Sequence, residues 1–116
     1  MQVKATKEGL EGKRTASGYV IDHNVTFVAL PAGKALHRHV KVTNPANGLS
    51  AIAEVLDVGP WNTEDDNYVF DGARPAAESG KSVSGMGTNG AGIDLGERVW
   101  KALEMVDNSE VEWEFV

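Results

Sequence analysis

The sequence predicts a small, mainly-β barrel in a single domain, and three observations lead to that fold class. Segments of alternating or β-branched residues recur along the chain and are separated by turn-forming Gly, Pro, Asn and Asp. One segment near the C-terminal end has the spacing of an amphipathic helix. The length of 116 residues suits one ordinary domain with one hydrophobic core. Many strands and one helix favour a barrel over a sandwich or an alternating α/β sheet.

The N-terminal quarter is predicted to start loosely and then to form two strands. Residues 1–12 are polar and contain two glycines, so we expect a flexible lead-in, with the domain spanning residues 13–116. Residues 18–30 hold β-branched and aromatic runs on both sides of Asp22-His23-Asn24. Because Asp and Asn favour turns, this segment predicts two short strands around a tight turn.

A hairpin is predicted next. Residues 39–43 alternate polar with apolar side chains, which is the period of a half-buried strand. Residues 44–48, Asn-Pro-Ala-Asn-Gly, form a strong turn signal because Pro presets one dihedral angle and Asn-Gly tolerates positive φ. Residues 49–58 are nearly all apolar and are expected to return as a strand covered on both faces.

The C-terminal half is predicted to contain a long insertion, one helix and a last strand. Residues 59–92 are rich in Gly, Asn, Asp and Ser without a period, and connections of that length are usually functional, internally packed or disordered. Asp94 and Glu97 match a capping box, and the apolar residues that follow at every fourth position predict a helix over about 95–106. Residues 111–116 alternate strictly and predict a strand, whose inward side chains would be Val111, Trp113 and Phe115.

Composition narrows the classes of function. Lys plus Arg total 11 and Asp plus Glu total 17, so the net charge of −6 disfavours nucleic acid, whose phosphates must be neutralised. The absence of cysteine excludes disulfides, thiolate nucleophiles and cysteine-ligated metals. No stretch reaches the roughly 18 apolar residues of a membrane span, and the N-terminus lacks the apolar segment of a signal peptide. We expect a monomer with no cofactor and no metal site, because no set of ligands has suitable spacing.

An ordered set of motifs resembles the RlpA-like double-psi β-barrel family. These are Lys13-Arg-Thr-Ala-Ser-Gly18, Leu30-Pro-Ala-Gly33, Val40-Lys-Val-Thr-Asn44, Val55-Leu-Asp-Val-Gly-Pro60 and Gly92-Ile-Asp-Leu95. The resemblance covers roughly residues 12–116. It implies a six-stranded double-psi β-barrel, here with one short helix at about 95–106 and an insertion at 59–92. The superfamily includes expansins, barwin-like proteins, a lytic transglycosylase barrel and family 45 cellulases, so it implies a cell-wall polysaccharide such as peptidoglycan as partner. It also implies a periplasmic, extracellular or phage-associated location.

Two aspartates are the candidate catalytic residues. Asp57 occupies the position of the aspartate that the family's transglycosylases use as both acid and base. Independently, burial at the end of an apolar strand can raise the pKa of such a carboxyl toward neutrality, although an Asp there can also cap the following turn. Asp94 stands where expansins and family 45 cellulases have a cleft aspartate, but it is also the predicted helix N-cap. Both roles stay open for each residue.

The candidate substrate-binding residues are Trp61, Tyr19, Tyr68, Glu54 and His23. Aromatic rings stack on sugars, so Trp61 and Tyr68 are subsite candidates, and the alternative is a mini-core that holds the insertion together. Tyr19 stands where lytic members of the family carry a Glu, and the family's His is missing as well. Glu54 or His23 would then be the assisting group.

The sequence therefore predicts a domain that binds, and in its enzymatic form cleaves, cell-wall glycan by lytic-transglycosylase or glycoside-hydrolase chemistry. Two alternatives remain, because a fold does not determine a function. One is a non-catalytic, expansin-like carbohydrate-binding module, favoured by the missing Glu and His. The other is a protein-interaction or inhibitor module on the same barrel, favoured by the long insertion and the acidic second half of the chain.

Overall fold

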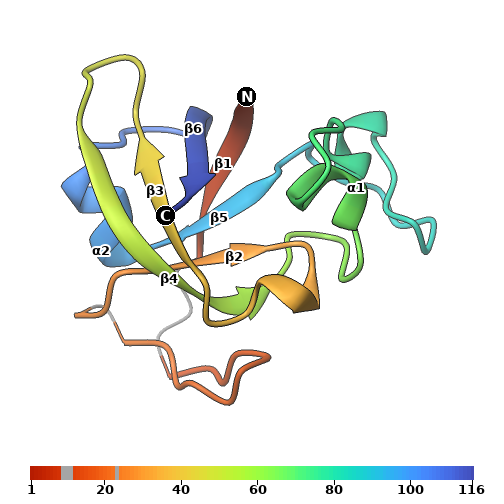
Figure 1. Cartoon of the computed structure of the whole chain (residues 1–116), viewed down its shortest axis with the longest axis horizontal. Coiled ribbons are helices and arrows are strands. Elements are labelled where there is room, and N and C mark those ends of the chain that lie inside the picture. The colour runs from red at the N-terminus through yellow and green to blue at the C-terminus, as the bar shows by residue number, and fades with distance from the viewer. Residues whose placement is uncertain (9–11, 23) are drawn as a thin grey trace.

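The computed structural model describes residues 1–8, 12–22 and 24–116, and within them six strands close into a barrel (Figure 1). In chain order these are β1 (Gln2–Glu8), β2 (Phe27–Leu30), β3 (His39–Thr43), β4 (Ser50–Val58), β5 (Ile93–Gly96) and β6 (Ser109–Phe115). Around the barrel the order is β1-β5-β2-β4-β3-β6. Two short α-helices, α1 (Asp66–Val69) and α2 (Glu97–Ala102), and the 3-10 turns Gly33–Ala35 and Ala76–Ser79 complete the described elements. The predicted mainly-β, six-stranded barrel is confirmed.

The first strand corrects the prediction of a flexible lead-in over residues 1–12. Residues 2–8 form β1, which pairs in parallel with β5 and antiparallel with β6 and so joins the two ends of the barrel. Val3 and Ala5 are fully buried, while the side chains between them face outward. This polar outer face made the segment look like a tail. Residues 9–11 lie outside the described residues.

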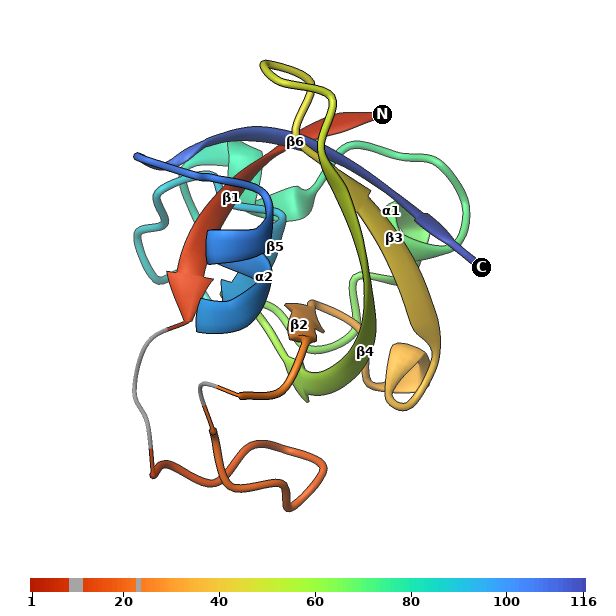
Figure 2. The ribbon, with the colours of Figure 1, turned by 90° about the vertical axis from the view of Figure 1, so that its left-hand side faces the viewer.

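Residues 18–30 form one strand where two were predicted. Only β2 is regular, and the earlier half contributes a single isolated bridge between Arg14 and Val20. Ile21 instead packs with Phe27 and Leu56 in a small apolar cluster that is separate from the barrel core. Figure 2 shows residues 12–22 looping out below β2.

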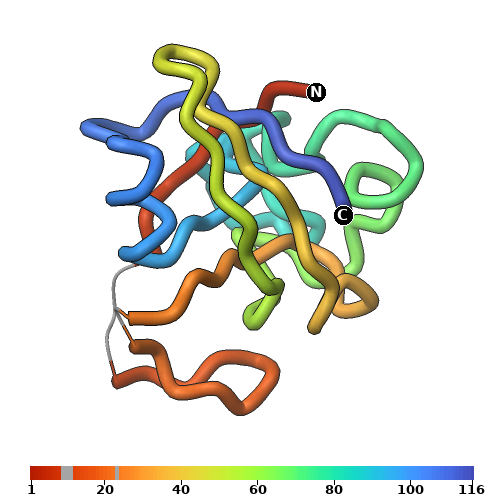
Figure 3. Tube along the Cα trace, turned by 60° about the vertical axis from the view of Figure 1, so that its left-hand side comes forward, coloured from red at the N-terminus to blue at the C-terminus, as the bar shows by residue number. Residues whose placement is uncertain are grey.

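The predicted hairpin is confirmed, with β3 and β4 paired antiparallel from His39 opposite Glu54 to Thr43 opposite Ser50. Its turn projects at one end of the molecule, opposite to residues 12–22 (Figure 3). The side chains of Asn44 and Asn47 each donate a hydrogen bond to the Leu103 carbonyl at 3.0 Å. They satisfy an oxygen at the C-terminal end of α2 that has no partner within the helix.

The helix is shorter than the predicted span of 95–106. Residues 93–96 form β5, and α2 begins only at Glu97, with Gly96 as its N-cap. Leu95, Val99 and Leu103 are fully buried, so the four-residue spacing continues from a core-facing strand residue into the helix. Val106, the last residue of the predicted span, is 94% exposed. Strand pairing overrides the local helix signal here.

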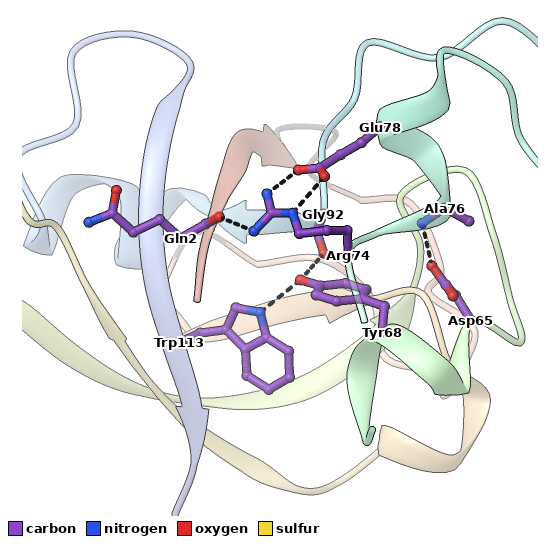
Figure 4. A network of polar contacts seen from close by, with 8 residues as sticks. All are labelled: Gln2, Asp65, Tyr68, Arg74, Ala76, Glu78, Gly92 and Trp113. Atoms are coloured by element: carbon purple, nitrogen blue, oxygen red, sulfur yellow. Dashed lines mark hydrogen bonds and ion pairs between the residues drawn. The ribbon is translucent and has the colours of Figure 1, made fainter. Parts of the chain in front are cut away.

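The insertion at 59–92 is folded and packs beside the barrel (green to teal in Figure 1). The Tyr68 hydroxyl donates to the Gly92 carbonyl at 2.9 Å and accepts from Trp113 Nε1 at 2.8 Å (Figure 4). Arg74 pairs with Glu78 and donates to the Gln2 carbonyl at 3.0 Å. These contacts tie the insertion to both terminal strands.

The last strand, β6, begins two residues earlier than predicted and has its expected inward side. Val111 is fully buried, whereas Trp113 and Phe115 are half-buried and pack against the core. The Phe115 ring stacks on Phe70 of the insertion with ring centroids 5.5 Å apart. Phe70 of the insertion thus covers one side of the Phe115 ring, and the Trp113 and Phe115 side chains of β6 remain partly exposed.

Candidate functional site

Four adjacent strands place one row of side chains on the outside of the barrel. Thr6 of β1 pairs with Asp94 of β5, Asp94 pairs with Ala29 of β2, and Ala29 pairs with Asp57 of β4. Directly paired residues lie on the same face of a sheet. The neighbouring positions along the four strands fill the barrel core, and they include Ala5, Val28, Leu30, Val55, Ile93 and Leu95.

A β-bulge brings Asp57 into this row. Val28 pairs with Val55, but the next residue of β2 pairs with Asp57, which leaves Leu56 as the extra residue of β4. Side chains alternate between the faces of a strand, so without the bulge Asp57 would point inward like Val55. Leu56 instead packs with Phe27 and Ile21 in the small apolar cluster outside the barrel core, which we call the outer cluster. The bulge therefore aims the carboxyl of Asp57 toward Asp94.

Glu8 adds a third carboxyl. It lies two residues after Thr6 in β1, on the same face, and its side chain hydrogen-bonds to Asp57. Burial, that hydrogen bond and the negative charges of Asp57 and Asp94, in this order, raise the pKa of Glu8 to about 9. Glu8 therefore holds a proton at neutral pH. Its Oε2 atom is buried and has no hydrogen-bond partner among the described residues.

Asp57 is half-buried and accepts two backbone hydrogen bonds on Oδ1, from Ala16 at 2.9 Å and from Val58 at 2.8 Å. This matches the turn-capping role that the sequence left open. The side chain also takes part in the carboxyl cluster through Glu8.

Asp94 has a role different from the predicted helix cap. It lies within β5, so the N-cap interpretation is wrong. Burial raises the pKa of Asp94 to about 6, opposed by a hydrogen bond that Thr6 Oγ1 donates to it and reinforced by the charge of Asp57. The site thus combines a carboxyl that is neutral at pH 7 with one that titrates just below it.

A surface pocket of about 550 Å³ opens beside these groups, and we call it the carboxylate pocket. Trp61 lies at its rim, 38% exposed, and Trp61 Nε1 donates to Asn89 Oδ1 at 2.9 Å. Its backbone has φ of 70°, a conformation that is strained for a bulky residue and is found most often at functional sites. The pocket is lined by Thr6, Lys7, Glu8, Pro60, Trp61, Asn89, Asp94 and Asn108.

The other predicted site residues lie elsewhere. Tyr68 is 3% exposed and belongs to the core, as the mini-core alternative proposed, so its assignment to substrate binding is corrected. Glu54 faces His37, with Oε2 3.0 Å from Nδ1, and does not join the carboxyl cluster. Tyr19 packs edge-on against Phe27 in the outer cluster. His23 lies outside the described residues.

Glu8 is the site residue that sequence reasoning missed. A signal for it was present, because Val3 and Ala5 alternate with Lys4 and Thr6 as they would in a half-buried strand. That alternation places Glu8 on the same outward face as Thr6. Recognising the strand would not have revealed its neighbours, since the pairing of β1 with β5 joins residues almost ninety positions apart.

Neither a group of metal ligands nor a membrane-spanning helix occurs among the described residues. Within residues 1–8, 12–22 and 24–116, no group of three or more His, Asp or Glu side chains is placed to hold a metal ion. None of the helices described is long and apolar enough to cross a membrane.

The fold and the comparisons define this chain as a small six-stranded β-barrel domain. It belongs to a protein family described as "Domain of unknown function (DUF8814)", whose model matches residues 1–114. No curated protein matches the sequence. Among solved structures, "Streptomyces papain inhibitor (SPI)" is similar with a TM-score of 0.56 and 20% identity, over 100% of this chain and 93% of that one. A likeness at this identity concerns the fold.

Proposed function

We propose that this domain is a protein-interaction module that inhibits a partner enzyme. The observation that carries the proposal is a folded insertion with large apolar side chains on its surface. Val83 is 84% exposed, Met86 is 60% exposed and Trp61 is 38% exposed. Exposed apolar groups gathered on one element are typical of protein-binding surfaces. The similar solved structure is, by its title, a papain inhibitor.

The attachment of the insertion supports the same proposal. Ordering a flexible loop on binding subtracts from affinity, so an effective inhibitor presents its contact surface already ordered. Here the Tyr68 hydroxyl links β6 to the start of β5 (Figure 4). The Asp65 side chain accepts from the Ala76 amide at 2.8 Å and so fixes the connection between α1 and the second 3-10 turn.

The test is to measure hydrolysis of a fluorogenic peptide by papain in the presence of increasing amounts of the domain. We expect a dose-dependent loss of activity that persists after prolonged incubation, since a merely competing substrate would be consumed. The same titration with a serine protease and a metalloprotease defines the class of enzyme. No inhibition of any of the three at large molar excess would contradict the proposal.

A second candidate function is binding or cleavage of a cell-wall glycan in the carboxylate pocket. The specific observation in its favour is the grouping of a neutral acid, Glu8, an ionisable Asp94 and the exposed ring of Trp61 around one pocket. A protonated carboxyl can donate to a glycosidic oxygen while a second carboxylate acts as base, and an indole can stack on a sugar.

Incubation with peptidoglycan sacculi tests this second function. Wild type, Glu8→Gln and Asp57→Asn are compared, and the soluble products are analysed by mass spectrometry. Anhydro-muropeptides from wild type and the control variant, but not from Glu8→Gln or Asp57→Asn, would support cleavage, and retention on sacculi without products would support binding. Asp71→Asn is the control, because this exposed carboxyl lies in the insertion and does not line the pocket. If wild type neither releases products nor is retained on sacculi, this second function is excluded.

A further inference from the structure

The insertion ends in a tight turn, residues 80–88, which we call the tip turn. It lies on the side of the insertion away from the barrel (teal in Figure 1). A bridge pairs Lys81 with Gly87, the Ser82 amide donates to the Met86 carbonyl at 2.8 Å, and the Thr88 amide donates to the Gly80 carbonyl at 2.9 Å. These bonds make the turn a short hairpin whose backbone is paired along its length.

Ser82 holds the turn from inside. It is 6% exposed, and its hydroxyl accepts from the Met86 amide at 3.0 Å and lies 2.9 Å from Ser84 Oγ. Gly85 adopts φ of 92°, a left-handed conformation that suits glycine, and its amide donates to the Ser82 carbonyl. The tip turn is therefore set by its own hydrogen bonds and does not need a partner to take its shape.

A second contact fixes the tip turn to the rest of the insertion. The Val83 amide donates to Asn62 Oδ1 at 2.8 Å, and Asn62, next to Trp61, is itself 6% exposed. Val83 projects from this anchored backbone with 84% of its surface exposed. A surface pocket of about 510 Å³ lies beside it and is lined by Trp61, Asn62, Thr63, Glu64, Val83 and Ser84.

We infer that the tip turn is the partner-binding element and that Val83 is its anchor, entering an apolar recess in the active-site cleft of the inhibited enzyme. This inference rests on the proposed inhibitory function. A rigid loop with an exposed apolar side chain at its tip has the features of an interface anchor, which fills a pocket at little cost in conformational entropy.

Charge around the tip turn indicates the rim of that recess. The insertion carries five acidic and two basic side chains. Arg74 is neutralised by Glu78, Glu64 borders the pocket beside Val83, and Lys81 lies in the tip turn itself. The complementary surface is therefore an apolar recess whose rim carries a basic group facing Glu64 and an acidic group facing Lys81. The carboxylate pocket has a different lining and shares only Trp61 with this surface.

The experiment compares inhibition of papain by wild type, Val83→Asp and Val106→Asp. Val106 is the matched control because it is 94% exposed and lies after α2, outside the insertion. We expect Val83→Asp to raise the inhibition constant at least about tenfold and Val106→Asp to leave it within about twofold. Thermal unfolding of all three proteins is measured in parallel, and equal midpoints show that the variants are folded.

A third variant tests the rigidity. Asn62→Ala removes the bond to the Val83 amide while leaving the anchor side chain in place, so we expect weaker inhibition through a slower association or a faster dissociation. If wild type inhibits papain and Val83→Asp inhibits equally well, the inference is overturned while the inhibitory function stands. If wild type does not inhibit papain, the proposed function is contradicted for this enzyme class, and this inference is overturned with it.

Discussion

Glu8 has a larger rise in pKa than Asp94, the other carboxyl of the pocket whose pKa is raised. The Glu8 carboxyl lies in a partly enclosed position next to two other carboxyls, and its pKa is raised to about 9 from an ordinary 4.5. Between these two values the folded state binds a proton that the unfolded chain releases. The contribution of Glu8 to stability is therefore fully present below about pH 4.5 and is lost as the pH rises toward 9.

Replacing this residue makes the effect measurable. Glu8→Gln keeps the shape and the hydrogen-bond donor but cannot ionise, so we expect it to raise the thermal midpoint at pH 8 and to flatten its decline between about pH 5 and 9. Because Glu8 is partly exposed, the gain is of the order of 1–2 kcal/mol. Thermal unfolding at a series of pH values checks this. Parallel curves for wild type and Glu8→Gln would show that Glu8 is ionised in the folded state at neutral pH.

Single residues were predictable from the sequence where a local signal marked them. Asp57 and Asp94 stand in recognisable motifs, and the structure brings both into one outward row. Their assigned roles still depended on a bulge in β4 and on the start of β5, neither of which has a sequence signature of its own. The substrate-binding assignment of Tyr68 was wrong and the mini-core alternative describes it, because an aromatic residue in a polar loop fits a ligand platform and an internal anchor equally well.

At the scale of elements, the Tyr68 hydroxyl links the insertion to the barrel by two hydrogen bonds. It connects Trp113 Nε1 of β6 with the Gly92 carbonyl next to β5. Tyr68→Phe leaves both groups without this partner. We therefore expect the free energy of unfolding to fall by about 1–3 kcal/mol and hydrogen exchange within residues 59–92 to become faster. Tyr19→Phe is the control, since the Tyr19 hydroxyl makes only a 3.5 Å contact with the Asp22 carbonyl. Equal losses for both variants would contradict this role of Tyr68.

The junction between β5 and α2 requires a glycine, Gly96, because Phe27 occupies the space that a side chain would need. A Cβ atom at Gly96 would lie 2.6 Å from Phe27 Cε1 and 2.9 Å from the Phe27 carbonyl, so a ring and a strand would both have to move. We expect Gly96→Ala to destabilise the domain by about 1–3 kcal/mol. Gly87→Ala is the control, because a Cβ there has open space and no positive φ. A stability change in Gly96→Ala no larger than in this control would show that the junction adjusts freely.

Elements formed by nearby residues were predicted better than those formed at a distance. The hairpin of β3 and β4 is closed by the six residues 44–49, so alternation and turn chemistry together fix its register. Residues 94–97 match a capping box, yet pairing with β1 and β2 makes residues 93–96 a strand. These partners lie far away in the sequence, and a local pattern holds no information about them.

At the scale of the whole molecule, the barrel is closed by the first strand. β1 is the only described strand that bridges β5 and β6, and Val3 and Ala5 place it in the core. Removing residues 1–8 would expose the backbone edges of both neighbours and open the apolar interior to water. We therefore expect the truncated chain to lose cooperative thermal unfolding, with circular dichroism as the measurement.

A second deletion, in the tip turn, is the control. It shortens the chain without opening the barrel. The amide of Thr88 already bonds to the carbonyl of Gly80, so residues 81–87 can be replaced by a two-residue turn between ends that are in contact. We expect this variant to unfold cooperatively near the wild-type temperature, because the tip turn contributes no strand to the barrel. A cooperative transition in the chain lacking residues 1–8 would contradict the role of β1 in closing the barrel, because it would show that the other five strands suffice to form the core.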